Sequence, residues 1–430
     1  MSRESYESGF VIRGITMSRG EQIKIIVVGG GAAGLFAAVI AGRQGAQVTI
    51  LERNQRVGKK ILATGNGRCN LTNMDMDISH FHGKNPKFAY NALHAFDNIQ
   101  AIEFFEQLGI SHKVEEEGKV FPFSNQASSV LDVLRYELEC LGIETKVEAE
   151  VKEIRKQAKG FDIFTKDGTK YFAHRVILAT GGKAAPNLGS NGSGYALVEK
   201  LGHHLVEPFP SLVQLKLAEP FLKQIKGIKF DGEAEIIVKG KNLAKAQGEI
   251  LFTDYGISGP PIFQLSRTAA ERLKENQEVW VKVVLINHLP KDNLVNYVTK
   301  RWQDNPEKNV SFSFVGFINK QLVPVLLKQS GLEDINKPVA LLTAQEKENI
   351  INILQDWRLK VTGTNTWTAA QVTAGGIDVK DINQNTMESK LVPGLFFAGE
   401  VMDIDGDCGG YNLQWAWSSG YLAGKSAEEF

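Results

Sequence analysis

Six residues near the N-terminus, Gly29-Gly30-Gly31-Ala32-Ala33-Gly34, fit the pattern G-x-G-x-x-G between an apolar run and an Ala-rich run. In this pattern the first glycine permits a tight turn, the second lets the backbone approach a pyrophosphate, and the third lets a helix pack on a strand. Glu52 lies 18 residues beyond Gly34, where a carboxylate accepts hydrogen bonds from ribose hydroxyls and repels a 2′-phosphate. The segment therefore predicts a binding site for FAD or NAD rather than NADP.

Three further segments favour FAD over NAD. Arg53 and Lys60 follow Glu52 with a glycine beside them, which resembles the continuation seen in two-dinucleotide-domain flavoproteins. The segment Ala179–Gly182 resembles the A-T-G element of those proteins, and Leu395–Glu400 resembles their C-terminal strand-Gly-acid element. The resemblance implies that the late carboxylate lies near the ribityl chain and phosphates of the cofactor. We therefore predict non-covalently bound FAD and no dedicated nicotinamide-binding domain.

Five longer segments carry a resemblance to one family: Val57–Asn73, Leu251–Pro260, Ala370–Gly376, Thr386–Ser389 and Gly399–Trp417. Together they resemble the aminoacetone-oxidase-like family of FAD-binding proteins, within the two-dinucleotide-binding-domain flavoproteins. That family also includes bile-acid-type flavin reductases, and many of its members have no assigned substrate. The resemblance extends over about residues 23–426 and implies an FAD domain built from both chain ends, with an inserted β domain and an inserted helical domain.

The tail of the chain forms the second part of the predicted cofactor site. Gly409-Gly410 would let the backbone approach the flavin ring, and a helix beginning at Tyr411 would direct its free N–H groups toward the N1–O2 edge, where negative charge develops on reduction. Val372, Thr373 and Gly375-Gly376 are expected to form another wall. The predicted cofactor-binding residues are Gly29, Gly31, Ala33, Gly34, Glu52, Arg53, Lys60, Asn70, Thr72, Thr180, Gly181, Gly182, Thr373, Gly399, Glu400, Gly410, Asn412 and Leu413.

Acid–base candidates are few, and we predict two catalytic residues, Tyr411 and Asp254. A phenol at position 411 could orient a substrate, and core packing with Trp415 at the i, i+4 spacing is the alternative interpretation. Asp254 stands in the segment LFTDYGISGP at a position where members of the family often have histidine. A carboxylate there would suit an ammonium-bearing substrate, and a solvated turn is the alternative.

Other polar residues receive no catalytic role from the sequence. His80 and His82 have no partner that the sequence identifies, and His203-His204 is interpreted as structural. Asp403, Asp405 and Asp407 alternate, but the residues between them do not fit an EF-hand loop, so no metal site is predicted.

The elements that must position these residues indicate an α/β fold. Strands are predicted at Ile23–Val28, Val48–Leu51 and Arg175–Ala179, with a helix over Ala32–Gln44, which is the start of a Rossmann-like domain. Further helices are predicted near Phe88–Leu108 and at Ser128–Leu141 behind the N-cap pair Ser128–Ser129, and a meander of strands at Glu144–Ile154, Phe161–Thr165 and Tyr171–Phe172. The middle of the chain shows strand patterns at Leu212–Leu217, Glu233–Val238, Glu249–Phe252 and Glu278–Leu285, and a helical pattern at Ala344–Trp357.

These patterns predict three domains. The FAD-binding domain is discontinuous and comprises residues 17–200 and 362–430. An antiparallel β domain comprises residues 201–288 and part of 340–361, and a small helical domain comprises residues 289–345. Residues 1–16 show no apolar periodicity and precede a second methionine, so we expect them to be disordered or extraneous to the fold.

Composition restricts the class of protein further. The chain has 49 Lys+Arg and 49 Asp+Glu, which argues against a nucleic-acid or anionic-membrane partner held by bulk charge. The uncharged run Ile25–Gly42 contains a glycine triplet, so we interpret it as strand, turn and helix rather than a membrane span, and expect a cytoplasmic protein. The three cysteines form no close-spaced pair, which excludes a disulfide scaffold and a Cys-built zinc site.

The sequence thus predicts an FAD-dependent oxidoreductase that passes hydride between a small organic substrate and flavin N5. Two cycles remain open, an oxidase acting on an aminoacetone-like amine and a reductase in which NAD(P)H is a transient reductant. An FAD-binding RNA-modifying or regulatory protein is the alternative from another class. The substrate and the oligomeric state are not specified by the sequence.

Overall fold

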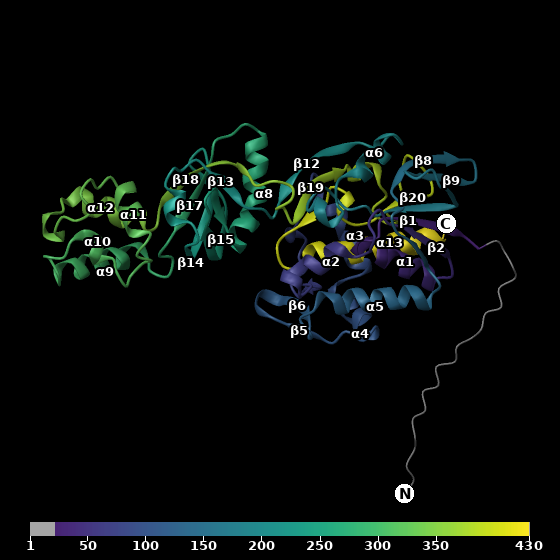
Figure 1. Ribbon diagram of the computed structural model, residues 1–430, viewed down its shortest axis with the longest axis horizontal. Coiled ribbons are helices and arrows are strands. Elements are labelled where there is room, and N and C mark those ends of the chain that lie inside the picture. The colour runs from purple at the N-terminus through teal and green to yellow at the C-terminus, as the bar shows by residue number, and fades with distance from the viewer. Residues whose placement is uncertain (1–21, 430) are drawn as a thin grey trace, which may run out of the picture.

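The computed structural model describes residues 22–429, so the segment 1–16 lies outside the described residues. Three units stand in a row in Figure 1: a Rossmann-like unit that contains both ends of the described chain, a β-barrel, and a small helical unit at the far end. The chain enters the first unit, passes through the barrel into the helical unit, and returns by the same route.

A five-stranded parallel sheet forms the centre of the Rossmann-like unit. Its strands, in spatial order, are β20 (Leu395–Phe397), β11 (Arg175–Leu178), β1 (Lys24–Val28), β2 (Gln47–Leu51) and β7 (Glu144–Lys146). Strand β1 is apolar and buried except at Lys24, as expected for a parallel strand covered on both faces. The chain proceeds from β1 outward through β2 on one side and through β11 on the other. The order in which the chain adds strands to the sheet therefore reverses between β1 and β11. Open α/β sheets bind ligands at such a reversal point.

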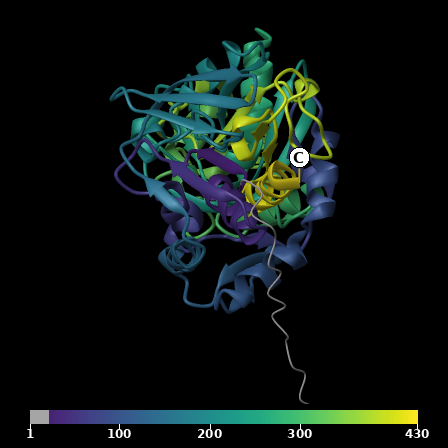
Figure 2. The same cartoon turned by 90° about the vertical axis from the view of Figure 1, so that its right-hand side faces the viewer.

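The two ends of the described chain pack directly against each other. Helix α1 (Ala32–Arg43) is buried along most of its length and contacts the C-terminal helix α13 (Tyr411–Glu429), which lies beside it in Figure 2. Gly420 and Gly424 lie where the helices are closest, because a Cβ at these positions would approach Ala33 O and Ala37 O to 2.8 Å and 2.5 Å. This contact makes the first and last elements of the chain one structural unit.

Helices and small sheets complete the Rossmann-like unit, and they correct three predictions. The helix predicted near Phe88–Leu108 is two helices, because Asp97 forms a capping box with Gln100 and starts a new one. The helix predicted behind Ser128–Ser129 begins at Ala127, so both serines lie in its first turn. The segment predicted as one strand, Glu144–Ile154, is divided, because β7 pairs with β2 and only β8 belongs to the meander. The remaining elements of the unit are α2 (Lys59–Ala63), β3 (Thr72–Asn73), β4 (Phe81–His82), α3 (Ala89–Ala95), α4 (Asn98–Gln107), β5 (His112–Val114), β6 (Lys119–Pro122), α5 (Ala127–Cys140), β8 (Val151–Gln157), β9 (Gly160–Thr165), β10 (Lys170–Ala173), α6 (Ser193–Glu199) and β21 (Asp405–Gly406).

The second unit is a closed antiparallel barrel reached through a two-stranded ladder of β12 (Leu205–Ser211) and β19 (Val372–Ile377). Its strands are β13 (Leu215–Leu217), β14 (Lys229–Val238), β15 (Lys241–Phe252), β16 (Gly256–Ser258), β17 (Val279–Val284) and β18 (Trp357–Thr364). The short helix α7 (Leu222–Ile225) and the long helix α8 (Pro260–Lys274) accompany them. Strand β15 begins eight residues before the predicted Glu249, because its first half is exposed and lacks an apolar alternation. Helix α8 begins with two prolines, which suit the first turn because no N–H is required there.

The third unit is inserted between β17 and β18 of the barrel. It comprises α9 (Lys291–Gln303), α10 (Val310–Ser313), α11 (Val323–Gln329) and α12 (Ala344–Ile353). Helix α12 starts at a capping box of Thr343 and Glu346 and ends before Trp357, which the sequence pattern had included in the helix. A single hydrophobic cluster runs from the barrel into these helices, so the two inserted units share a core.

The predicted α/β class, with a Rossmann-like parallel sheet and an antiparallel β unit, is confirmed. The domain boundaries remain a proposal, and β12 within the range 201–288 pairs with β19 rather than with the barrel. Within residues 22–429, no helix is both long and apolar enough to cross a membrane.

Candidate functional site

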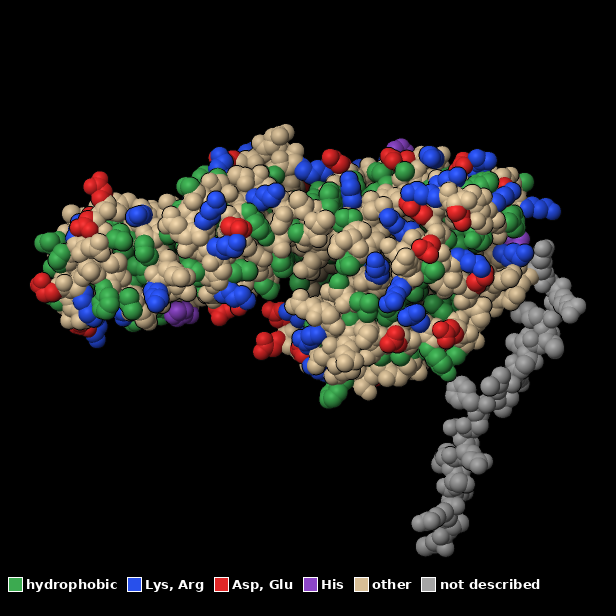
Figure 3. All heavy atoms as spheres, viewed as in Figure 1, with side chains coloured by type: hydrophobic (Ala, Val, Ile, Leu, Met, Phe, Trp, Pro, Cys, Tyr) green, Lys and Arg blue, Asp and Glu red, His purple; other side chains and the backbone are tan. Residues whose placement is uncertain are grey.

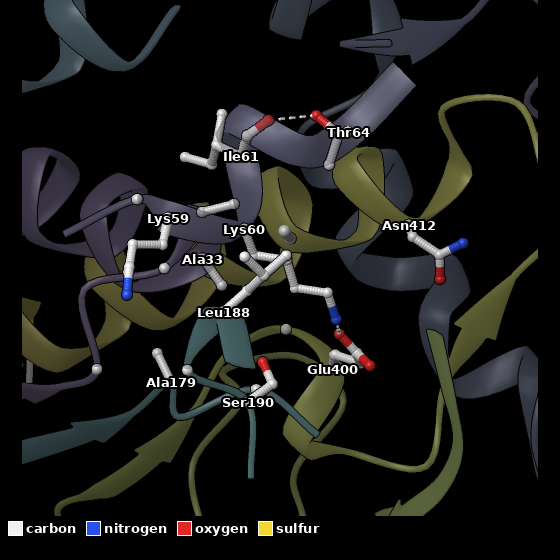
Figure 4. A pocket seen from close by; sticks show the side chains of 18 of the residues that line it. Ala33, Lys59, Lys60, Ile61, Thr64, Ala179, Leu188, Ser190, Glu400 and Asn412 are labelled. Carbon is white, nitrogen blue, oxygen red and sulfur yellow. Dashed lines mark hydrogen bonds and ion pairs between the residues drawn. The ribbon is translucent and has the colours of Figure 1, made fainter. Parts of the chain in front are cut away.

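A cavity of about 360 Å³ opens at the carboxyl ends of four neighbouring strands of the parallel sheet. Its wall includes the residues that follow β1, β2, β11 and β20, namely Gly29, Glu52, Ala179 and Ala398. The predicted cofactor residues that line it are Gly29, Gly31, Ala33, Glu52, Arg53, Lys60, Asn70, Thr180, Gly181, Gly399, Glu400, Gly410, Asn412 and Leu413. Segments from both chain ends and the middle therefore meet at one site, part of which is drawn in Figure 4.

The glycine motif builds the turn between β1 and α1. Gly29 has a φ of 105°, and a Cβ at Gly34 would lie 1.9 Å from Gly29 O, so both positions require glycine for the protein's own packing. Gly31 differs, because a Cβ there would meet no atom within 4 Å, and the residue lines the cavity. A glycine at position 31 therefore keeps open a space at the start of α1, where free N–H groups attract a phosphate. Gly34 itself lies behind the cavity wall.

Glu52 is fixed at the end of β2 by three hydrogen bonds. Its Oε2 accepts from Gly30 N at 2.8 Å, and its Oε1 accepts from the backbone N and the Nδ2 of Asn54, both at 2.7 Å. The carboxylate is 7% exposed and lies beside the glycine turn. Glu52 thus holds the motif in shape in addition to lining the cavity, a role that the sequence pattern did not indicate.

An ion pair lies across the middle of the cavity wall. Lys60 Nζ is 2.6 Å from Glu400 Oε2, and the pair is marked by a dashed line in Figure 4. Glu400 Oε1 accepts a hydrogen bond from Thr373 N at 2.8 Å. Thr373 does not line the cavity, because its Oγ1 accepts hydrogen bonds from Lys183 N and Ala184 N. A Cβ at Gly182 would lie 2.3 Å from that hydroxyl oxygen, so Gly182 also lies behind the wall. These two residues support the site rather than face it.

Two polar atoms on the wall lack partners within the part of the chain that the structure describes. They are Arg53 Nη1, a donor, and Asn70 Oδ1, an acceptor, and both are buried side-chain atoms of cavity-lining residues. Unpaired buried polar atoms are costly, so a bound polar ligand would satisfy them. Together with the open space at Gly31, they show that the residues present fit a dinucleotide such as FAD.

The N-terminus of α13 faces the cavity through Gly410, Asn412 and Leu413. Asn412 folds back on the preceding loop, accepting from Gly406 N at 2.9 Å and donating to Gly406 O at 2.7 Å. Thr72 lies behind this loop and donates to Gln414 Oε1 at 2.7 Å, so it does not line the cavity. The tail is therefore held in shape mainly by its own polar side chains.

Neither predicted catalytic residue faces the cavity. Tyr411 is 5% exposed and stacks on His80 with ring centroids 4.3 Å apart, so the structure favours its packing role, and burial raises the pKa of its phenol. Asp254 lies in an exposed turn of the barrel, 2.7 Å from Lys226 Nζ, and this hydrogen bond lowers the pKa of the carboxyl. Trp415, interpreted from the sequence as core, is buried but lines the cavity and donates to Gly399 O.

The sequence missed the residues that close the cavity on the side of the barrel. Leu212 precedes β13, Pro260 and Phe263 belong to α8, and Gln371 precedes β19. Cys408 faces them from the tail, and its backbone N donates to Gln264 Oε1 of α8 at 3.1 Å. Leu212 has a φ of 48°, an unusual backbone conformation for a branched residue, of the kind found at binding sites. The segment Leu251–Pro260 entered the sequence analysis through its family resemblance, and no feature of it indicated that the start of α8 would reach the site.

Comparison with known proteins agrees with this geometry. Residues 23–426 match the model of a family described as the HI0933-like protein Rossmann domain. The chain belongs to the HI0933-like family. It is 41% identical over 408 residues to a 3-dehydro-bile acid delta(4,6)-reductase of Clostridium scindens, covering 94% of this chain and 99% of that protein.

Two other relatives of this chain are named as ribosomal RNA dihydrouridine synthases. It is 30% identical to a ribosomal RNA dihydrouridine synthase of Escherichia coli and 32% identical to that of Haemophilus influenzae, in each case covering 93% of this chain and 97% of the other. A solved 3-ketosteroid delta1-dehydrogenase of Sterolibacterium denitrificans is 10% identical and covers 95% of this chain and 100% of that one, with a TM-score of 0.49, too low to bear on function. The predicted family resemblance is confirmed, and the protein is an FAD-dependent oxidoreductase.

Proposed function

We propose that this protein is a reductase that saturates a carbon–carbon double bond conjugated to a carbonyl group in a cyclic, largely apolar small molecule, with NAD(P)H as reductant. The observation that carries this proposal is the 41% identity over nearly the whole chain to a relative named as a bile acid delta(4,6)-reductase. The dihydrouridine synthase names point to the same bond chemistry, because dihydrouridine is uridine with a ring double bond saturated beside a carbonyl. An oxidase acting on an amine has no such support.

The residues at the barrel end of the cavity suit an apolar substrate. Leu212, Pro260 and Phe263 offer hydrocarbon surface, and Gln371 offers one amide that could hydrogen-bond a substrate carbonyl. The wall around Gly31, Glu52, Arg53 and Asn70 would hold the cofactor, which supplies hydride transfer at its N5 atom when bound. The work of the protein is then to orient the alkene over the ring, exclude water and provide a proton.

A small molecule is favoured over RNA as the substrate by the higher identity to the bile acid reductase. Lys, Arg, Asp and Glu side chains are interspersed over the face shown in Figure 3, without a continuous basic surface. A submicromolar affinity for ribosomal RNA at physiological salt would favour the RNA-modifying alternative instead.

Anaerobic spectroscopy of the purified holoenzyme tests the proposal. We expect NADH or NADPH to bleach the flavin band at about 450 nm, and a 3-oxo-4,6-diene bile acid to restore it without oxygen. Aminoacetone added in place of the nucleotide serves as the matched test of the oxidase cycle. Bleaching by the amine, with no response to either nucleotide, would refute the reductase proposal.

A further inference from the structure

Two histidines and one aspartate form a hydrogen-bonded cluster at the edge of the cavity. Asp407 Oδ1 is 2.6 Å from His82 Nε2, and Asp407 Oδ2 is 3.0 Å from His80 Nδ1. The pairing of β4 with β21 brings His82 beside the tail loop, and His80 stacks on Tyr411. No partner of either histidine could be identified from the sequence, and in the structure both hydrogen-bond Asp407.

This cluster connects the cavity with bulk water. Asp407 lines the cavity and is 15% exposed, whereas the side chains of His80 and His82 are 27% and 33% exposed. Asp407 directly precedes Cys408, which contacts α8 next to the apolar wall at Phe263. The cluster therefore lies at the end of the cavity where we place the substrate.

The other carboxylates of the wall, Glu52, Glu150 and Glu400, are engaged elsewhere. Glu52 accepts three hydrogen bonds at the glycine turn, and Lys60 pairs with Glu400. Glu150 pairs with Lys166 beside the meander. Among the described carboxylates that line the cavity, Asp407 is the one bonded to partly exposed imidazoles, which can exchange protons with water.

We propose that Asp407 is the catalytic proton donor of the reduction and that His80 and His82 are positioning residues that reload it from solvent. The proposal rests on the proposed function. Saturation of the conjugated bond adds a hydride with its two electrons at the β-carbon and a proton at the α-carbon. An imidazolium first passes its proton to the Asp407 carboxylate along the existing hydrogen bond, Asp407 passes that proton to the α-carbon, and water reprotonates the imidazole. Each turnover consumes one hydride, resupplied by NAD(P)H, and one proton.

The charges around the cluster are consistent with a stored proton. Burial acts to lower the pKa of His80, but hydrogen bonds to Asp407 and Asp75 outweigh it and raise the pKa above its usual 6.5. Burial acts to raise the pKa of Asp407, but hydrogen bonds from His82 and His80 outweigh it and lower that pKa. Asp405, Asp77 and Glu117 also face the cluster or Tyr411, so the surroundings favour imidazolium. The proton is therefore held on His80 rather than on Asp407 until it is drawn toward the substrate.

Asp407→Asn, His80→Gln and His82→Gln test the relay in stopped-flow reoxidation of the reduced holoenzyme by a 3-oxo-4,6-diene bile acid. We expect Asp407→Asn to slow reoxidation by about 100-fold, the usual contribution of a general acid. In the wild type the rate should fall as the pH rises through the raised pKa of His80, and His80→Gln should displace that limb. His112→Gln is the matched control, because His112 forms a similar pair with Glu106 away from the cavity.

Titration of 15N-labelled histidines by NMR gives a readout that needs no substrate. We expect the pKa of His80 to fall in Asp407→Asn, because one of its carboxylate partners is lost. An unchanged His80 titration, or reoxidation of Asp407→Asn within threefold of wild type with an unaltered pH profile, would overturn the relay. A loss of rate in Cys408→Ser with Asp407→Asn unaffected would also overturn it. If the bile acid does not reoxidise the wild type, the proposed function fails, and the NMR titration still decides whether the cluster is coupled.

Discussion

Replacing Gly31 with valine separates ligand binding from folding at the cofactor site. Gly31 has φ −81° and ψ −172°, an extended conformation that valine adopts without strain, and its Cβ direction is open for 4 Å. The folded apoprotein should therefore lose at most about 1 kcal/mol, from the weaker N-cap preference of valine. The side chain would instead occupy the space at the start of α1 where we place the pyrophosphate.

The expected loss of FAD affinity follows from the contacts that the pyrophosphate would lose. A hydrogen bond to a charged group contributes about 1.5–3 kcal/mol, so loss of two such bonds costs about 3–6 kcal/mol. At about 1.4 kcal/mol per tenfold, the Kd for FAD should rise at least about 100-fold. The assay measures the ratio of flavin to protein as purified, then the Kd by fluorescence quenching, with the thermal midpoint of the apoprotein as the measure of folding.

Two other glycines supply the controls for this experiment. Gly363 in β18 also has an open Cβ direction but does not line the cavity, so Gly363→Val should leave flavin content unchanged. Gly34→Ala should lower the thermal midpoint of the apoprotein itself, because its Cβ would lie 1.9 Å from Gly29 O. Stoichiometric FAD with an unchanged Kd in Gly31→Val would refute the placement of the pyrophosphate.

Three further substitutions test the electrostatics of the site and its surroundings. Asp254→Asn should leave kcat/KM within twofold of wild type, because Asp254 lies in an exposed ion pair outside the cavity, and a larger change would restore it as a catalytic candidate. Arg267→Met should lower the free energy of unfolding by about 3–5 kcal/mol in urea denaturation, because it leaves the buried Asp405 carboxylate unpaired; a loss below about 1 kcal/mol would contradict this. Burial raises the pKa of Asp403 to about 6, so its contribution to stability is present below the unfolded value of 3.8 and is lost as the pH rises toward 6. Asp403→Asn should flatten this decline between pH 4 and 6, and an unchanged slope would show that other groups cause it.

The parts of the fold that could be predicted from the sequence are those specified within a short segment of the chain. The turn at Gly29, the helix after it and the acid at the end of β2 lie within one short segment, so their spacing specified their arrangement. The start of a new helix at Asp97 could also have been predicted, because Asp97 and Gln100 have the spacing of a capping box. The division of Glu144–Ile154 into two strands could not have been predicted, because the pairing of β7 with β2 is a contact between distant segments.

The residues that line the barrel side of the site could not be predicted either, because contacts between distant segments place them. Phe263 reaches the cavity because α8 docks on the tail, through Gln264 to Cys408 and Arg267 to Asp405. Asp254 and Tyr411 were selected for their chemical type, and the fold places one in a solvated turn and the other against His80. The chemical type of a residue is therefore not enough to predict which polar residues face the ligand.

The packing of α1 against α13 also sets the order in which the molecule can be assembled on a ribosome. The glycine turn after β1 is synthesised before the barrel and the helical unit, but the loop and helix start at Gly409–Leu413 that complete the cavity are synthesised after both. Before α13 emerges, the apolar face of α1 that it covers stays uncovered, while the barrel and the helical unit already have all their strands and helices. The inserted units can therefore fold first, and the cofactor site is complete only when the segment from Gly409 onward packs beside β1 and α1.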